Sequence, residues 1–491
     1  MKTEVDMYHI SDIKKYLRCE LLYFYSRDEA NTFIPFLRAD DNIMDLLSER
    51  FGIKEYFEGI RNDQSQRFLD NIAEYEWFYH PRLNDGELRI NIPLVHKKDD
   101  GFDLYFLFYG TDPKDIDILS YRICTEIMEQ YGFKVSDIYL ISFNSDYVNE
   151  GKLDPAGLLK IEKRYRGKRI IDRVRSSPID YKDILSQMET GSSESCVPQK
   201  KRYCRFYGLC NYYGKCFPQE ENDADDSILT LVSSGHKNDM YDEGIRFLKD
   251  ADLNRLEGNK VQYAQVMASR KGGCFIDRMA LHSFLEKLDA RPISFIDFEW
   301  DRYLIPAYEK MKPLDVVCFE FALYYIDEQG HMEHRTFVST GDCRQEFVEA
   351  LLEYLPDKGP ILAYNAQGAE CLRLKELSEI YPQYSKQLEA VIGRFVDLAV
   401  PFVEGVVYDV RMRGNFTLKK LVDICSDYSY HDLDIDDGMA AVLNWRHIDK
   451  GEETDGDKIV ADLKEYCSLD AYGLFLVYRW LIQLMSESKY S

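Results

Sequence analysis

The stretch ISFIDFE, residues 293–299, places two carboxylates in a short apolar run. If the run is a strand, Asp297 and Glu299 leave the same face, because side chains alternate along a strand. Adjacent carboxylates repel each other, and a divalent cation between them relieves the repulsion. In a chain with 86 acidic residues the pair alone is weak evidence, since solvated acids at a strand end give the same pattern.

The chain is acidic, globular in composition and long enough for more than one domain. A length of 491 residues exceeds what one ordinary core supports, which predicts two or three domains. The 62 Lys and Arg against 86 Asp and Glu give a formal net charge of −24, so the overall field does not attract nucleic acid. Any nucleic-acid binding must then come from local basic patches or bound metal ions.

The sequence shows neither a membrane segment nor an export signal. Its apolar runs are too short to span a bilayer, and residues 1–6 lack the apolar core of a signal peptide. We therefore expect a cytoplasmic protein without membrane contact, in which thiols stay reduced. The 12 cysteines are then thiols or metal ligands rather than disulfides.

An ordered series of strands and helices follows the acidic pair. The pattern predicts two more strands joined by a hairpin at Asp327–Gly330, then a helix, a strand, a helix, a short strand and a terminal helix. We expect these elements, in order, over residues 315–326, 334–339, 344–355, 360–365, from about 370, 394–398 and 457–485. The terminal helix carries Tyr466 and Asp470 four residues apart, on one face.

This order resembles the ribonuclease H-like fold of proofreading-type 3′–5′ exonucleases, the family named for its Asp-Glu-Asp-Asp residues. Three motifs carry the resemblance: Asp297-Phe298-Glu299, Tyr364-Asn365 followed by Glu370, and Tyr466-Cys467-Ser468-Leu469-Asp470. The resemblance implies an α/β fold with a ribonuclease H-like mixed sheet. It also implies hydrolysis of phosphodiester bonds in single-stranded DNA or RNA with two Mg²⁺ or Mn²⁺ ions.

The same resemblance implies a role for each of five residues. Asp297 would bridge both metal ions. Glu299 and Asp470 would complete the site of the ion that binds the attacking water. Glu370 would hold the second ion, and Tyr466 would orient the nucleophile.

The second motif departs from the family pattern at Glu370. The family usually has Asp in this place, whereas Glu370 has a longer side chain and lies five residues after Asn365. Asp397, at the end of the short strand, could replace or support Glu370, or could simply cap the strand end.

The pattern of the N-terminal part predicts a second α/β unit. We expect mainly helices over residues 8–80, strands within 87–108, a helix over 116–131 and a strand over 138–143. The basic segment 160–169 could contact phosphates or be a solvated helix end. An acidic linker over 219–227 leads into a helical connector over 239–288. The predicted domains are therefore 1–218, 219–290 and 291–491.

Four cysteines fall in one turn-rich segment, interleaved with Tyr, Gly and basic residues: Cys196, Cys204, Cys210 and Cys216. In a reducing compartment such spacing favours a metal or iron–sulfur site over a core, although spacing does not separate zinc from a cluster. Cys19 on its own is better explained as a small buried apolar residue.

Residues from about Arg291 to Leu484 are similar to an uncharacterised bacterial family that fuses a RecB-like nuclease region to this exonuclease-like domain. Two further motifs support this likeness: Arg394-Phe395-Val396-Asp397-Leu398 and Gly414-Asn415-Phe416-Thr417-Leu418-Lys419. The N-terminal half resembles the CRISPR-associated RecB-like exonucleases, in which one early and three later cysteines hold a 4Fe–4S cluster. This implies Cys19, Cys204, Cys210 and Cys216 as ligands, with Cys196 as an alternative to one of them.

The RecB-like nuclease signature is broken. These enzymes need an Asp on one strand and Glu-x-Lys on the next, whereas the chain offers Asn91 and the aromatic run 106–109. Aromatic side chains do not ligate Mg²⁺, and Asp103 lacks its partners. We therefore expect an inactive N-terminal domain that serves as a scaffold or nucleic-acid platform.

Two functions are consistent with these features. The first is a metal-dependent 3′–5′ exonuclease that acts on single-stranded DNA or RNA through the C-terminal domain. The second is a non-catalytic nucleic-acid-binding or assembly protein built from two degenerate nuclease folds.

Overall fold

The computed structural model describes residues 7–27, 37, 43–200, 202–205, 210–217, 225–256, 258–428, 435, 437–452 and 455–486. The N-terminal stretch 1–6, most of the acidic linker (219–224) and part of the cysteine segment (206–209) lie outside the described residues. The fold is mixed α/β with several sheets, as the sequence predicts.

The chain forms two compact units. Unit 1 comprises Met1–Glu221 and Arg302–Asp315, and unit 2 comprises Asn222–Asp301 and Val316–Ser491. The sequence predicts three domains with boundaries at residues 219 and 291. That division into three functional parts stays a prediction.

Unit 1 is built on a six-stranded sheet of order β2-β3-β6-β7-β8-β9 and a three-stranded sheet of order β1-β5-β4. Its elements are β1 (Tyr8–His9), α1 (Ile10–Arg18), α2 (Glu20–Ser26), α3 (Ile43–Phe51), β2 (Phe57–Glu58), α4 (Ser65–Asn71), β3 (Trp77–Tyr79), β4 (Arg82–Asn84), β5 (Leu88–Asn91), β6 (Leu94–Lys98), β7 (Gly101–Leu107), α5 (Ile118–Gln130), β8 (Val135–Phe143), α6 (Pro155–Leu158), β9 (Leu159–Glu162), β10 (Arg164–Tyr165), β11 (Lys168–Arg169), α7 (Ile170–Arg175), α8 (Tyr181–Thr190) and α9 (Tyr213–Cys216). The parallel pair β7 and β8 needs a crossover, which α5 supplies by packing Ile123 and Ile127 into the same core as Leu104.

The basic segment 160–169 is not a helix end. It forms the end of β9 and the antiparallel ribbon β10–β11, which turns at Arg166 and Gly167. Both turn residues have positive φ, 47° and 79°, which a tight two-residue turn requires. The alternative of a solvated helix end is therefore wrong, and contact with phosphates stays a prediction.

Unit 2 is built on a five-stranded sheet of order β15-β14-β13-β16-β17. Its elements are α11 (Lys237–Asp242), α12 (Lys260–Arg270), β12 (Cys274–Ile276), α13 (Arg278–Leu285), β13 (Ile293–Arg302), β14 (Val316–Ile326), β15 (Met332–Val338), α14 (Arg344–Tyr354), β16 (Ile361–Ala363), α15 (Glu370–Ile380), α16 (Ser385–Ile392), β17 (Phe395–Asp397), α17 (Val400–Val403), β18 (Val407–Asp409), α18 (Leu418–Cys425), α19 (Gly438–Asp449) and α20 (Gly456–Ser486). The predicted elements occur in the predicted order, but the structure adds α16 between α15 and β17, and α17, β18, α18 and α19 between β17 and α20, none of which was predicted. The predicted helical connector is wrong in one respect, because it also contains β12, which pairs antiparallel with β18.

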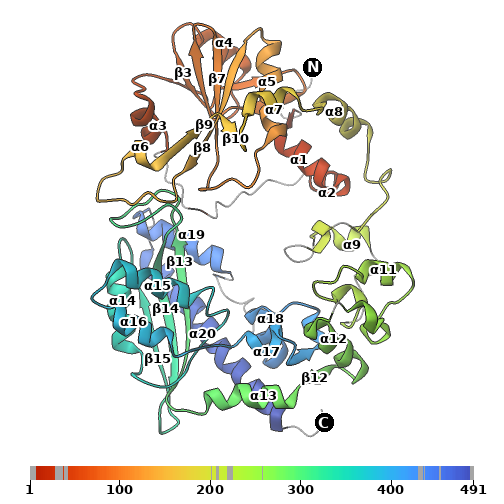
Figure 1. Ribbon diagram of the computed structural model, residues 1–491, viewed down its shortest axis with the longest axis vertical. Helices are drawn as coiled ribbons and strands as arrows, with labels where there is room; N and C mark the ends of the chain where they lie inside the picture. The colour runs from red at the N-terminus through yellow and green to blue at the C-terminus, as the bar shows by residue number, and fades with distance from the viewer. Residues whose placement is uncertain are drawn as a thin grey trace. The chain divides into compact units, whose positions relative to one another are not determined.

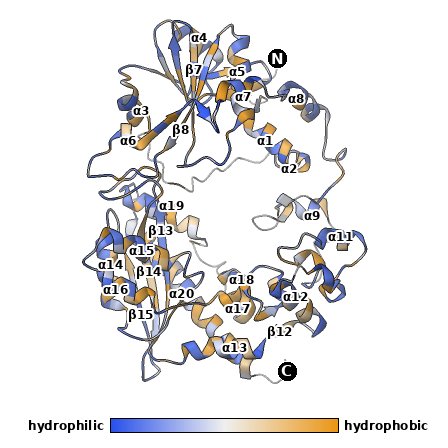
Figure 2. Cartoon of the chain, viewed as in Figure 1, coloured by the Kyte–Doolittle hydropathy of each residue, from blue (hydrophilic) through white to orange (hydrophobic). Residues whose placement is uncertain are grey.

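The two faces of this sheet are covered differently (Figure 1). Ile296 and Phe298 of β13 point into a core with residues of α14, α15 and α16. Phe295 points to the opposite face of the strand, where its ring centroid lies 5.6 Å from that of Phe475 and 5.5 Å from that of Tyr478, both on α20. Asp297 and Glu299 point to the same face as Phe295, so strand alternation directs both carboxylates towards α20. Figure 2 shows hydrophobic and hydrophilic residues interspersed along α14 and α16, as amphipathic cover requires.

Helix α20 is 31 residues long, yet it carries charged residues along its length. Among the described residues, no helix combines the length and apolar character that crossing a membrane requires.

A buried ion pair fixes α19 to β13. The guanidinium of Arg446 donates to both carboxylate oxygens of Asp301, with Nε–Oδ2 and Nη2–Oδ1 distances of 2.9 and 2.7 Å. Asp301 is 1% exposed and Arg446 9%, so solvent does not screen the pair.

We expect Arg446→Ala to lower the free energy of unfolding by about 3–5 kcal/mol, because Asp301 would remain buried without these two bonds. Chemical denaturation followed by tryptophan fluorescence measures the loss. Arg335→Ala is the control, since Arg335 pairs with Glu333 at an exposed position and should cost at most about 1 kcal/mol. Equal losses in the two variants would contradict the assigned role of the buried pair.

Candidate metal centre

Three carboxylates from two distant segments meet on the α20 side of the sheet. Asp297 and Glu299 of β13 and Asp470 of α20 each offer an oxygen, and these oxygens lie within 4.8 Å of one another. Asp470 is buried, whereas Asp297 and Glu299 are partly exposed. Among the described residues, these three alone bring three or more His, Cys, Asp or Glu ligand atoms so close together. The structure thus places together three of the four predicted metal ligands.

Burial and the close approach of these acids raise the pKa values of Asp297 and Glu299. Burial, followed by the charges of Asp470, Glu299 and Glu370, raises the pKa of Asp297 well above its usual value. Burial and then Asp470 also raise the pKa of Glu299, while Lys419 acts in the opposite direction. Without a cation the group therefore retains protons that a bound divalent ion would displace.

Tyr466 and Cys467 line the same place from α20. Burial, Asp470 and Glu299 raise the pKa of Tyr466, whose side chain is hydrogen-bonded to Asp470. The Tyr466 hydroxyl thus stays protonated at neutral pH. The Cys467 thiol lies 3.7 Å from Oδ2 of Asp297 and 3.5 Å from its carbonyl oxygen, so it can donate to either acceptor.

A cation and a helix start border the three carboxylates. The Lys419 ammonium of α18 lies 4.9 Å from the centre of the Tyr466 ring. A Cβ atom on Gly438, the first residue of α19, would lie 3.7 Å from both carboxylate oxygens of Glu299. The N-terminal end of α19 therefore lies close to the Glu299 carboxylate, and the partial positive charge of a helix N-terminus favours a negative charge there.

Glu370 lies near this group without joining it. It is 2% exposed at the start of α15, and its Oε2 atom has no hydrogen-bond partner in the structure. Burial raises the pKa of Glu370 to about 8, its own backbone N–H opposes the shift, and Asp397 adds to it. Its charge acts on Asp297 and Glu299, yet it is not among the acids whose oxygens meet within 4.8 Å.

Asp397 acts on the backbone. Its Oδ1 atom accepts hydrogen bonds from the N–H groups of Asn365 and Ala399, each at 2.9 Å. One carboxylate oxygen is thus already engaged in joining β17 to the loop after β16. This geometry favours the capping interpretation over replacement of Glu370.

Sequence reasoning missed Glu320 and Cys467 near the site. Glu320 is the one acid in the apolar strand Val316–Ile326, and that isolation was a usable signal. Cys467 stands inside the Tyr-x-x-x-Asp motif, but a lone cysteine on a helix resembles any small core residue.

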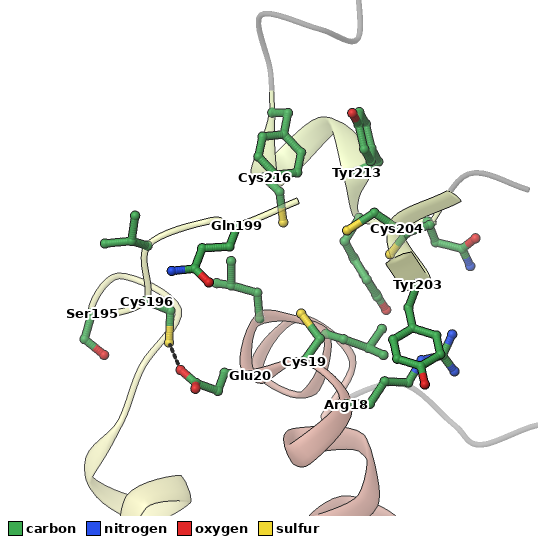
Figure 3. Close-up of a pocket in the computed structure, with 17 residues that line it drawn as sticks. Arg18, Cys19, Glu20, Ser195, Cys196, Gln199, Tyr203, Cys204, Tyr213 and Cys216 are labelled. Carbon is green, nitrogen blue, oxygen red and sulfur yellow. Dashed lines mark hydrogen bonds between the residues drawn. The ribbon is translucent and has the colours of Figure 1, made fainter. Parts of the chain in front are cut away.

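The predicted cysteine ligands line one cavity of about 460 Å³ in unit 1 (Figure 3). Five cysteines contribute to its wall: Cys19, Cys196, Cys204, Cys210 and Cys216. Burial raises the pKa of the Cys216 thiol to about 11, with smaller contributions from Cys19, Cys210 and Cys204. Among the described residues, no three of the sulfur atoms lie within 4.8 Å of one another.

Cys196 differs from the other four. Its thiol lies 3.3 Å from Oε2 of Glu20 and is a donor to it, as Figure 3 shows. The sulfurs of Cys19, Cys204 and Cys216 instead point towards the cavity in that view. The orientation favours the predicted set of four over a set that includes Cys196.

The positions of the broken RecB-like signature border another cavity in unit 1, of about 560 Å³. Asn91 and residues 106–108 line it, together with the aspartates at the start of α5. Asp103 is 1% exposed and forms an ion pair with Lys98, so it serves the structure of the sheet.

A family model described as a domain of unknown function, DUF2779, matches residues 294–417. The match includes Asp297, Glu299 and Glu370 but ends before α20. No curated protein and no solved structure matches the chain. The comparisons therefore name no activity for this region, and the exonuclease-like and RecB-like assignments stay proposals.

The raised pKa of Glu370 predicts a pH-dependent effect of Glu370→Gln. In the folded metal-free protein Glu370 titrates near 8, and in the unfolded chain near 4.5. The folded state then binds the extra proton between these values, so this group's contribution to stability falls as pH rises through that window. In EDTA, the variant should gain stability relative to wild type from pH 5 to pH 8 and level off above it.

Thermal unfolding at a series of pH values measures this difference. Glu353→Gln removes an exposed acid of α14 and should show no such trend. A pH-independent difference between Glu370→Gln and wild type would contradict the placement of Glu370.

Proposed function

We propose that this protein is a metal-dependent nuclease that removes nucleotides from the 3′ end of single-stranded DNA or RNA. The observation that carries the proposal is the meeting of Asp297, Glu299 and Asp470 within 4.8 Å, from segments about 170 residues apart in the chain. The direction of digestion rests on the resemblance to the proofreading-type exonucleases.

The donor atoms fit a hard divalent cation. All three close ligands are carboxylate oxygens, which Mg²⁺ and Mn²⁺ prefer. The Oε2 atom of buried Glu370, which has no hydrogen-bond partner in the structure, is a further donor atom, and the charge of Glu370 acts on Asp297. Bound metal ions would supply an activated water and stabilise the leaving oxygen.

The side chains around the acids provide the remaining functions. The Tyr466 hydroxyl, held by Asp470, can orient a water molecule by donating or accepting a hydrogen bond. The ammonium of Lys419 beside its ring can offset the charge of a substrate phosphate. The carboxylate of Glu299 in β13 lies beside Gly438, the first residue of α19, whose helix N-terminus favours a negative charge.

Unit 1 would serve the enzyme as a scaffold or nucleic-acid platform. Asn91 and the aromatic residues 106 and 108 at its second cavity cannot assemble a metal site of the RecB-like kind. The ribbon β10–β11, with Arg164, Lys168 and Arg169, offers local positive charge on an acidic chain.

We also propose that the cysteine cavity of unit 1 holds a metal centre, a 4Fe–4S cluster or zinc. Cys19 lies far in sequence from Cys204, Cys210 and Cys216, yet all four line the same cavity. Thiolates clustered in a reduced protein are suitable ligands for either centre.

We expect Asp297→Asn to abolish degradation, because the amide lacks the charge that holds the cation. Tyr466→Phe should lower kcat by about 10²-fold, the range of a lost proton-transfer or orienting group. Both are measured on 3′- and 5′-labelled single-stranded DNA and RNA with Mn²⁺ or Mg²⁺. Asp423→Asn, on the neighbouring helix α18, is the matched control.

The wild-type protein should shorten 5′-labelled strands progressively and release the 3′ label first. Degradation that persists in Asp297→Asn, or in EDTA, would contradict the proposal. Binding of the strands without degradation would support the non-catalytic alternative.

We expect protein purified without oxygen to contain stoichiometric iron or zinc, and Cys210→Ser to lose most of it. Elemental analysis and visible absorption give the content and separate an iron–sulfur cluster from zinc. Cys196→Ser is the matched control and should retain the metal, since its thiol faces Glu20. Metal-free wild type, or loss in Cys196→Ser alone, would contradict the assignment.

A further inference from the structure

Glu320 is a buried acid outside the three-carboxylate group. It lies in β14 with 0% of its surface exposed, and neither carboxylate oxygen has a hydrogen-bond partner in the structure. The strand around it is apolar, from Val316 to Tyr325. Burying such a group without partners destabilises a fold, and costs of this kind are typical of functional sites.

The register of β14 shows where the side chain points. Residues from Glu320 to Ile326 pair without interruption with β15, so Glu320, Ala322 and Tyr324 share one face. Ala322 packs with Cys467 of α20, and the Tyr324 ring lies 5.5 Å from that of Tyr472. Glu320 therefore faces α20, on the same side of the sheet as Asp297 and Glu299.

Its neighbours tie Glu320 to the metal centre. Its strand, β14, is the neighbour of β13, which carries Asp297 and Glu299, in the five-stranded sheet. Two residues along β14, Ala322 packs with Cys467, whose thiol lies 3.7 Å from Oδ2 of Asp297. Burial raises the pKa of Glu320, and the charge of Lys464, on α20 three residues before Cys467, lowers it.

We propose that Glu320 is a positioning residue of the metal centre, a carboxylate on the neighbouring strand β14 that strengthens cation binding without belonging to the three closest ligands. The inference rests on the proposed function, because it assigns a further residue to the same site. A divalent ion at Asp297, Glu299 and Asp470 would be the charge that compensates Glu320. Lys464 would oppose it by offsetting part of the negative field.

Calorimetric titration with Mn²⁺ tests the proposal at the site that Asp297→Asn removes. Glu320→Gln should weaken Mn²⁺ binding by about tenfold, the lower range for groups that support metal ligands. Glu320→Asp keeps the carboxylate, so its Mn²⁺ affinity should lie between those of Glu320→Gln and wild type. Lys464→Met should bind Mn²⁺ more tightly than wild type. Glu353→Gln makes the same change of charge on exposed α14 and should bind as wild type does.

A second measurement separates this role from a structural one. Without metal, Glu320→Gln should unfold at the same temperature as wild type or higher, since the amide replaces a carboxyl group whose ionised form is penalised by burial. Equal Mn²⁺ affinity in Glu320→Gln and Glu353→Gln would overturn the inference and leave the proposed function standing. If Glu320→Gln does not fold, equal affinity in Lys464→Met and wild type overturns it. Absence of Mn²⁺ binding in wild type would overturn the proposed function as well.

Discussion

Mutual repulsion of carboxylates on one side of β13 is the constraint on which the site in unit 2 depends. Strand alternation sends Asp297 and Glu299 to the face covered by α20, and the same helix brings Asp470 against them. Like charges so close cannot all ionise without a compensating cation. The arrangement therefore costs stability in the metal-free protein, and a bound divalent ion would relieve that cost.

The rest of unit 2 holds these acids against their repulsion. On one face, Phe298 packs edge-on against Phe347 at 5.0 Å and anchors β13 to the core under α14. On the other face, the small residues Cys467 and Ala471 let α20 approach the sheet. The Asp301–Arg446 pair then fixes α19, whose first residue borders Glu299. Apolar packing and one buried ion pair thus oppose the repulsion at the centre.

The order of elements and much of the site could be predicted from local patterns. The apolar run 293–299 indicated a strand, and alternation along it put Asp297 and Glu299 on one face. The four-residue spacing put Tyr466 and Asp470 on one helix face. Glu370 could not be placed, because its reach depends on the loop before it, where Asn365 has a φ of 58°. Three-residue β12 is too short for a periodic signal and pairs with a strand more than 130 residues later.

Glu320 was missed for a related reason: periodicity shows that residues alternate but not which face meets α20. The central claim, that the acids around Asp297 bind a divalent cation, is tested most directly by anomalous diffraction from crystals soaked in Mn²⁺. The account predicts an anomalous peak within coordination distance of Asp297, Glu299 and Asp470. Full occupancy of Mn²⁺ elsewhere on the acidic surface, with no peak among these three carboxylates, would contradict it.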